Sequence, residues 1–312
     1  DPRGIELVEE SKYGERALGF VTVASAIFHF RDTGGTHALP DDQNYLLVTV
    51  DGWPLDAGRG PGGRFTNAVT PAPATRPAAA TLQTGIHPLR TRVLFDDDAL
   101  GWNYLTMAEV LANEGYATGA FVGATELAAS SGLDQGFRTY SDEMFYGGLL
   151  HLNLLGHLLD GFQQPRTDDA VVDGFAAWME EKRDLPFYAW VHLREGDAAL
   201  DRVLALIEPL QDETMIAVVG THGPGEGLSE EAIRVPLSLH VPGRPAPTID
   251  AQVRLMDVPA AAFTFLGMEG PQTEGVDLGG YLDGTRKATV GCTLVGRDGA
   301  GAPLLAVRNN GM

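Results

Sequence analysis

Apolar residues recur along the chain with two periods, one typical of buried strands and the other of amphipathic helices. Unbroken apolar runs predict strands covered on both faces, at residues 45–50, 117–122, 187–192 and 215–219. Helical spacing of apolar residues predicts helices at residues 106–114, 167–182 and 197–210. Strands that alternate with helices in this way predict an α/β fold, with a mostly parallel central sheet sandwiched by helices.

The same pattern divides the chain into three parts. Residues 1–43 form an N-terminal extension, residues 44–283 the α/β domain, and residues 284–312 a small, truncated C-terminal strand region. This last part is rich in glycine and has strand-like runs such as 303–307, which predict a small second sheet. The alanine- and proline-rich stretch 72–80 lies between segments that continue the α/β pattern, so we interpret it as an ordered loop and helix start.

Composition and charge exclude some partners. The 312 residues are 44% hydrophobic, which is enough for a sizeable core. The 42 acidic residues outnumber the 22 basic ones, and the net charge of −20 argues against nucleic acid, because a phosphate backbone attracts clustered Lys and Arg. Cys292 is the sole cysteine of the sequence, so no internal disulfide indicates an oxidising compartment.

A further apolar run at residues 17–30 leaves two interpretations open. Its length of about 14 residues is shorter than the roughly 20 that a membrane-spanning helix needs. We interpret it as a buried strand or helix, with the remnant of a membrane anchor or signal segment as the alternative. Membrane association is therefore expected only through this run or through residues before Asp1, where we expect a processed or partial chain.

Candidate chemistry gathers at predicted strand ends. Asp51 ends the strand 45–50, and Thr221 and His222 follow the strand 215–219. In open α/β sheets ligands bind beyond the carboxyl ends of the strands, so a carboxylate and an imidazole there are candidate ligands of a divalent cation. Thr75, at the start of a predicted helix, is a candidate nucleophile. Taken singly, each residue is equally typical of a turn, cap or loop.

Several stretches occur in an order typical of one large enzyme group. They are N-Y-L-L-V-T-V-D (44–51), F-T-N-A-V-T-P-A-P-A-T-R-P (65–77), T-L-Q-T-G (81–85), T-M-A-E-V-L-A-N-E-G-Y-A-T-G-A-F-V-G (106–123), G-L-D-Q-G-F (132–137), P-F-Y-A-W-V-H-L (186–193), I-R-V-P-L (233–237) and V-R-L-M-D-V (253–258). Together they resemble the sulfatase branch of the alkaline phosphatase superfamily. The resemblance implies a mostly parallel sheet between helices and a smaller C-terminal sheet.

The resemblance also implies roles for site residues. Asp51 matches a metal ligand of the family, and Thr75 matches the nucleophile, which is a Cys or Ser matured to formylglycine, or else a Ser or Thr. The maturation motif C-x-P-x-R is broken here, because Thr75 cannot become formylglycine and Ala79 stands at the Arg position.

Other family positions are also altered. Thr221 stands where the family has a second metal-ligating Asp, and a hydroxyl is a poor substitute for a carboxylate on a hard cation. Gly52 and Pro54 replace two further site positions, although Asp56 matches its counterpart. The segments that usually supply substrate-site residues read R-E-G-D (194–197) and P-G-E-G-L (224–228).

One carboxylate and one imidazole hold Mg²⁺ or Ca²⁺ only weakly. We therefore expect a domain that has lost catalysis, needs no cofactor, and acts as a binding or structural module in a larger protein or assembly. A protein partner is expected at residues 1–39 or at the C-terminal strand region. The family's habit of export indicates a periplasmic or extracellular location.

Two alternatives stay open. In the first, the chain is an active sulfate, phosphate or phosphonate ester hydrolase with Thr75 as nucleophile. Asp51 and His222 would then hold one Ca²⁺ or Mg²⁺, with Asp56 or Glu226 as the replacement carboxylate. In the second, the same fold carries a lyase or transferase that needs no metal.

Overall fold

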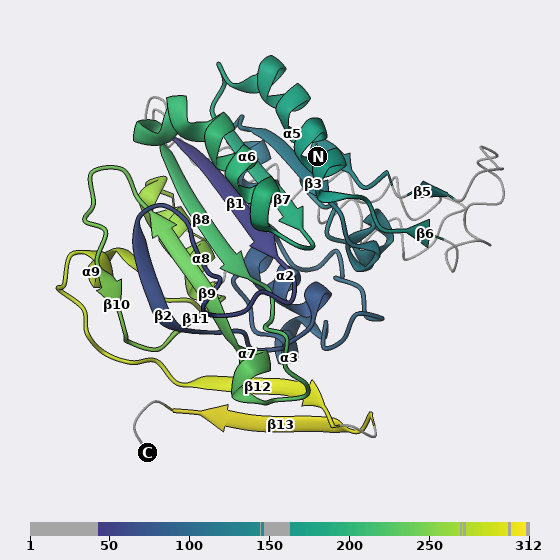
Figure 1. Ribbon diagram of the computed structural model, residues 1–312, viewed down its shortest axis with the longest axis vertical. Helices are drawn as coiled ribbons and strands as arrows, with labels where there is room; N and C mark the ends of the chain where they lie inside the picture. The colour runs from purple at the N-terminus through teal and green to yellow at the C-terminus, as the bar shows by residue number, and fades with distance from the viewer. Residues whose placement is uncertain are drawn as a thin grey trace, which may run out of the picture. The chain divides into compact units, whose positions relative to one another are not determined.

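A nine-stranded sheet runs through the computed structural model (Figure 1). The structure describes residues 43–143, 145–146, 163–268, 270, 273–298 and 301–309. The strand order is β10-β2-β9-β8-β1-β7-β3-β4, and β11 also pairs with β2. The bounds are β1 Asn44–Val50, β2 Gly63–Val69, β3 Ala117–Val122, β4 Thr139–Ser141, β7 Phe187–Leu193, β8 Thr214–Gly220, β9 Arg234–His240, β10 Thr248–Ile249 and β11 Val253–Arg254. Only β9 runs antiparallel to its neighbours among these described strands, which confirms the mostly parallel sheet.

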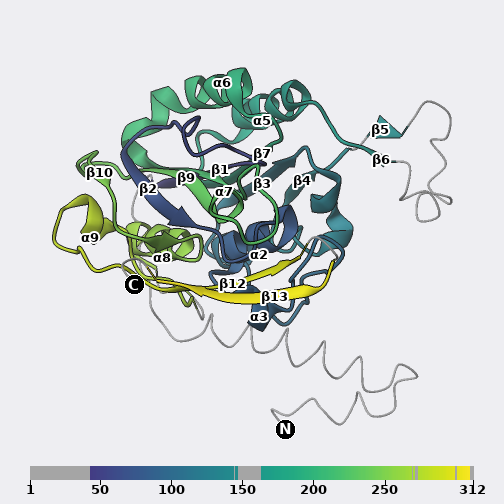
Figure 2. The same ribbon diagram turned by 60° about the horizontal axis from the view of Figure 1, so that its bottom comes forward.

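Helices cover both faces of this sheet (Figure 2). On one face lie α5 (Asp168–Lys182) and α6 (Asp197–Ile207). On the other lie α2 (Thr75–Thr84) and α8 (Asp257–Phe265), and α4 (Met107–Asn113) contacts α2. The shorter helices are α3 Pro88–Thr91, α7 Glu230–Ile233 and α9 Gly279–Leu282, with 3-10 turns at Thr125–Leu127, Ala129–Ser131 and Glu208–Glu213. The arrangement is a three-layer α/β/α sandwich.

The helix ends follow from local chemistry. The Thr167 side chain accepts a hydrogen bond from the backbone N–H of Ala170 and so caps α5. A capping box between Thr106 and Glu109 starts α4. The prediction of a helix to residue 210 was too long, because α6 ends at Ile207 and Pro209, whose ring cannot continue an α-helix, begins a 3-10 turn.

The predicted second sheet is confirmed as an antiparallel pair, β12 (Cys292–Arg297) and β13 (Pro303–Arg308). Cys292 and Leu294 of β12 pack with residues of β2 and α7 in a small apolar cluster. On β13, Leu305 is 66% exposed and Val307 is 67% exposed. A two-stranded pair, β5 (Phe145–Tyr146) with β6 (Gln163–Gln164), is separate from both sheets.

Two predictions for the N-terminal part concern residues outside the described ones. They are the extension 1–43, of which Gln43 alone is described, and the apolar run 17–30. The boundary at residues 283 and 284 stays a prediction. Within the described part of the chain, no helix has the length and apolar character to cross a membrane.

The strand order determines which residues meet at the carboxyl edge of the sheet. β1 lies between β7 and β8 and is parallel to both. Val50 of β1 lies opposite Leu193 of β7 and Gly220 of β8. The residues that follow Val50 and Gly220 are therefore neighbours.

Candidate functional site

The four site residues predicted from the sequence lie together at this edge. The Thr75 hydroxyl donates a hydrogen bond to Oδ2 of Asp51 at 3.0 Å. The Thr221 hydroxyl donates to Oδ1 of the same carboxylate. The Nε2 atom of His222 lies 3.9 Å from Oδ1. Asp51, which follows β1, is thus the common partner of two residues that follow β8 and of the first residue of α2.

His192 is a member of this group that the sequence analysis missed. It is fully buried near the end of β7, and its Nε2 atom lies 3.2 Å from Oδ2 of Asp51. This is an ion-pair distance, but the direction does not meet hydrogen-bond geometry. Nδ1 of His192 lies 2.9 Å from the hydroxyl oxygen of Thr49, which accepts a hydrogen bond from the Trp190 indole. We call Asp51, Thr75, His192, Thr221 and His222 the Asp51 cluster.

The charge of Asp51 is favoured by its neighbours. Burial raises its pKa, but the charges of the His192 and His222 imidazoles and the hydrogen bond from Thr221 outweigh burial and lower the pKa to about 2. His222 is oriented by its other nitrogen, because Nδ1 lies 2.9 Å from the Gly223 carbonyl oxygen. Asp51 is therefore ionised throughout the neutral range.

The N-terminal end of α2 already holds a carboxylate. No side chain caps it from Ala74, and the backbone N–H of Arg76 donates to Oδ1 of Asp96 at 2.8 Å. The Arg76 guanidinium points to backbone, donating to the carbonyls of Glu126 and Asp98 at 2.6 Å each. Helix N-termini of this kind bind anions, and here the anion is a side chain of the chain itself.

A cleft of about 570 Å³ opens in front of this helix end. Three acidic residues line it, Asp96, Asp97 and Glu126. Burial raises the pKa of Asp96, and the nearby charges of Glu126 and Asp51 act in the same direction. The cation of the cleft wall, Arg297, lies 3.8 Å above the Phe95 ring and 3.5 Å from Asp97. The cleft is thus acidic.

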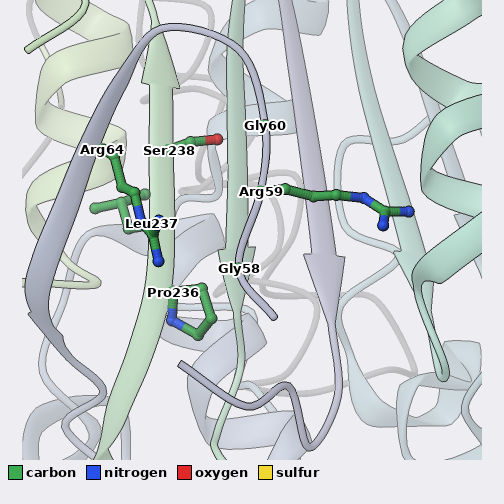
Figure 3. A pocket seen from close by; sticks show the side chains of 7 residues that line it. All are labelled: Gly58, Arg59, Gly60, Arg64, Pro236, Leu237 and Ser238. Atoms are coloured by element: carbon green, nitrogen blue, oxygen red, sulfur yellow. The ribbon is translucent and has the colours of Figure 1, made fainter. Parts of the chain in front are cut away.

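A smaller cavity of about 210 Å³ lies away from the cluster, between the loop after β1 and strand β9 (Figure 3). Arg64, Pro236 and Ser238 line it. Arg59 points away from it, and its guanidinium lies 3.2 Å from Asp201. A Cβ atom on Gly60 would lie 1.9 Å from the Ser238 hydroxyl oxygen, so only glycine fits this close approach. No residue of the Asp51 cluster reaches this cavity.

The divalent cation that the resemblance implies does not fit the side chains at this edge. Asp51 is the single carboxylate of the cluster, and the described residues contain no set of three His, Cys, Asp or Glu placed to hold a metal ion. Asp56 and Glu226, the candidate replacement carboxylates, are exposed and form no hydrogen bond or ion pair with the cluster in the described structure. Hard cations require more anionic oxygens than this.

Comparison with known proteins agrees with the fold. Residues 54–196 match the Sulfatase family model, a stretch that contains Thr75 and His192. The matched stretch is similar to the Sulfatase family, and the fold is that of solved sulfatases and phosphonate monoester hydrolases. A search of curated proteins finds no match to this sequence.

Solved structures similar to the sulfatase-like chain include two hydrolases and a sulfatase. The phosphonate monoester hydrolase of Agrobacterium radiobacter is 16% identical with a TM-score of 0.66, covering 86% of each chain. The 2-O GAG sulfatase BT1596 is 15% identical with a TM-score of 0.66, covering 86% of this chain and 81% of the other. The phosphonate monoester hydrolase of Silicibacter pomeroyi is 14% identical with a TM-score of 0.62, covering 82% and 80%. At these identities the likeness shows the fold alone.

Proposed function

We propose that this sulfatase-like domain does not hydrolyse esters and serves as a binding or structural module of a larger protein or assembly. The observation that carries the proposal is the hydrogen bond from the Thr75 hydroxyl to Asp51. A hydroxyl nucleophile must pass its proton to a base, and a base works best when its pKa lies near the working pH. With a pKa of about 2, Asp51 is too weak a base to take this proton.

The charge around the α2 N-terminus supports the same conclusion. Sulfate, phosphate and phosphonate esters are anions, whereas Asp96, Asp97 and Glu126 line the cleft. The Arg76 guanidinium is engaged with backbone carbonyls, and Arg297 lies near Asp97. Like charges that face each other across a binding site weaken binding, so this cleft disfavours an anionic substrate.

A protein partner is the second part of the proposal. β13 pairs with β12 on one side, and its exposed Leu305 and Val307 lie on a strand whose other edge has no partner among the described strands. Such an edge can accept a strand from a neighbouring protein. The acidic surface argues against nucleic acid, and the habit of the family supports a periplasmic or extracellular location.

One observation favours the alternative of an active hydrolase. Thr75 is the first residue of α2 and contacts Asp51, so the nucleophile position keeps its place beside a carboxylate. In that case Thr75 would attack the ester and some other group would accept its proton. His192 is a candidate, because its Nε2 atom lies 3.2 Å from the Asp51 oxygen that accepts the Thr75 hydrogen bond, and His222 lies 3.9 Å from the other oxygen.

Hydrolysis assays distinguish the two functions. Wild type, Thr75→Ala and the control Thr84→Ala, at the other end of α2, would be assayed with aryl sulfate, phosphate monoester and phosphonate monoester substrates, with and without Mn²⁺, Ca²⁺ or Mg²⁺. We expect no turnover by wild type above that of Thr75→Ala. Turnover that Thr75→Ala abolishes and Thr84→Ala retains contradicts the loss of catalysis.

The partner is tested by size. We expect the chain to associate with itself or with a co-purified protein at native concentration, and Leu305→Lys with Val307→Lys to weaken that association. Leu185→Lys is the matched control, because Leu185 is also an exposed leucine but lies in the turn before β7. A monodisperse monomer with no bound protein, unchanged by the β13 variant, argues against this surface.

A further inference from the structure

Both oxygens of the Asp51 carboxylate accept hydrogen bonds from hydroxyl groups. Oδ1 accepts from Thr221, and Oδ2 accepts from Thr75 and faces Nε2 of His192. Thr221 is fully buried and Thr75 nearly so, which leaves these hydroxyls little access to water. The Thr221 backbone N–H also donates to the Val50 carbonyl at 3.0 Å, so its side chain is held in register with Asp51.

The direction of these hydrogen bonds matters for a cation. A carboxylate binds a divalent ion through the lone pairs of its oxygens, and each lone pair that accepts a hydrogen bond is one fewer for the cation. A carboxylate at position 221, as the resemblance implies for the family, would instead repel Asp51 unless a cation lay between them. A hydroxyl at position 221 instead donates a hydrogen bond to Asp51, so the two side chains attract each other without a cation.

We infer that Thr221 exchanges the family's cation for an internal hydrogen-bond lock, in which Asp51 ties together the ends of β1, β7 and β8 and the start of α2. The lock holds the carboxyl edge of the sheet in its folded arrangement with protein groups alone. The inference rests on the proposed function only in that both concern the Asp51 cluster. It makes position 221 the residue that determines whether this edge takes a divalent cation.

Variants of Thr221 test the lock by thermal unfolding, with EDTA or with saturating Mn²⁺, Ca²⁺, Mg²⁺ or Zn²⁺. We expect wild type and Thr221→Ser to have the same Tm in all conditions. Thr221→Val removes the donor and should lower the Tm by about 4 °C regardless of cation. Thr221→Asp should unfold earliest in EDTA and regain about 5 °C or more with at least one cation, because binding stabilises the folded state.

Thr214→Asp is the matched control for the added charge. Thr214 is also fully buried, also donates its hydroxyl to a partner, the Leu210 carbonyl, and begins the strand that Thr221 follows. Its hydroxyl partners are the Leu210 carbonyl and the Asn44 amide rather than a carboxylate, so no cation should rescue its variant. Calorimetric titration should show saturable cation binding by Thr221→Asp that is at least tenfold tighter than binding by wild type.

Three results would overturn the lock. One is stoichiometric cation binding by wild type that Asp51→Asn removes. The second is a Thr221→Asp variant that folds but gains nothing from any cation. The third is an equal Tm for Thr221→Ser and Thr221→Val. If Thr221→Asp does not fold, the comparison of these two variants tests the lock. The two proposals can fail separately. Ester turnover by wild type without a cation contradicts the proposed function but not the lock. Cation binding by wild type without turnover contradicts the lock but not the proposed function.

Discussion

Two of the carboxylates at strand ends and helix starts, Asp51 and Asp257, are satisfied in different ways. Asp257, in the first turn of α8, is fully buried, and its oxygens accept from the Arg254 guanidinium and from the backbone N–H groups of Arg254 and Val276. Asp51 is 18% exposed and is surrounded by hydroxyls and imidazoles, with no guanidinium or ammonium group. Asp257 therefore has the partners of a purely structural residue, whereas the Asp51 side chain remains partly exposed to solvent, as binding-site residues are.

The difference shows which carboxylates of this sulfatase-like fold are held by buried charged partners and which are not. The stretch that contains Arg254 and Asp257 keeps the family resemblance, because the pair ties the α8 start to the segment before it. At Asp51 the neighbours are hydrogen-bond donors, where the resemblance implies metal ligands. A carboxylate whose partners are weak and partly exposed can change its role, whereas one paired with a buried guanidinium cannot lose its partner without a large loss of stability.

Removing Asp257 should produce the largest effect. Asp257→Ala leaves the Arg254 guanidinium, only 14% exposed, without its carboxylate, and a broken buried pair costs about 3–5 kcal/mol of the free energy of unfolding. Asp169→Ala is the control, because its contact with Arg202 at 2.7 Å is an exposed ion pair that solvent screens, so its removal should change stability far less. Urea unfolding measures both. Equal losses would remove the contrast between a structural carboxylate and a surface one.

The sequence predicts the strands of the central sheet because their apolar runs are unbroken. The family resemblance, which implies that Asp51 and Thr221-His222 lie at neighbouring strand ends near Thr75, predicts that these residues meet. The sequence does not predict His192. A histidine inside an apolar run is equally typical of a sheet core, and its contact with Asp51 requires β7 to lie beside β1. That pairing joins residues 143 positions apart, such as Thr49 and His192, and depends on the whole sheet.

The sequence also did not predict that the Asp96 carboxylate lies at the α2 N-terminus. Asp96 follows Arg76 by 20 positions and lies in a loop, where no periodicity indicates its contact. The early end of α6, by contrast, had a local signal in Pro209. Local signals therefore predict elements and their ends, whereas the partners of a polar side chain depend on strand order and loop paths.

The loss of stability on protonation of Asp51 in acid should be smaller than the effect of Asp257→Ala. The folded Asp51 pKa of about 2 lies below the ordinary value of 3.8, so ionised Asp51 contributes stability above about pH 4 that is lost as the pH falls through about 2. The contribution at neutral pH is about 2 kcal/mol. The difference in unfolding free energy between wild type and Asp51→Asn, measured in urea from about pH 5 to pH 2.5, should shrink as the pH falls. A difference that is constant over this range contradicts the depressed pKa.

The smallest expected effect is the coupling between Thr75 and Asp51. Thr75→Val removes the hydroxyl and keeps the shape, so in a double-mutant cycle with Asp51→Asn the coupling should be about 1 kcal/mol, the usual net value of one hydrogen bond. Thr84→Val is the control in the same helix, because the Thr84 hydroxyl donates to the Ala80 carbonyl at 2.7 Å and should show no coupling to Asp51. If both threonines couple equally, the Thr75 hydroxyl does not act on Asp51, and the argument that Asp51 engages the nucleophile position loses its support. A coupling confined to Thr75 would show that its hydroxyl is bonded to Asp51. Thr75 stands at the position where the resemblance implies the nucleophile.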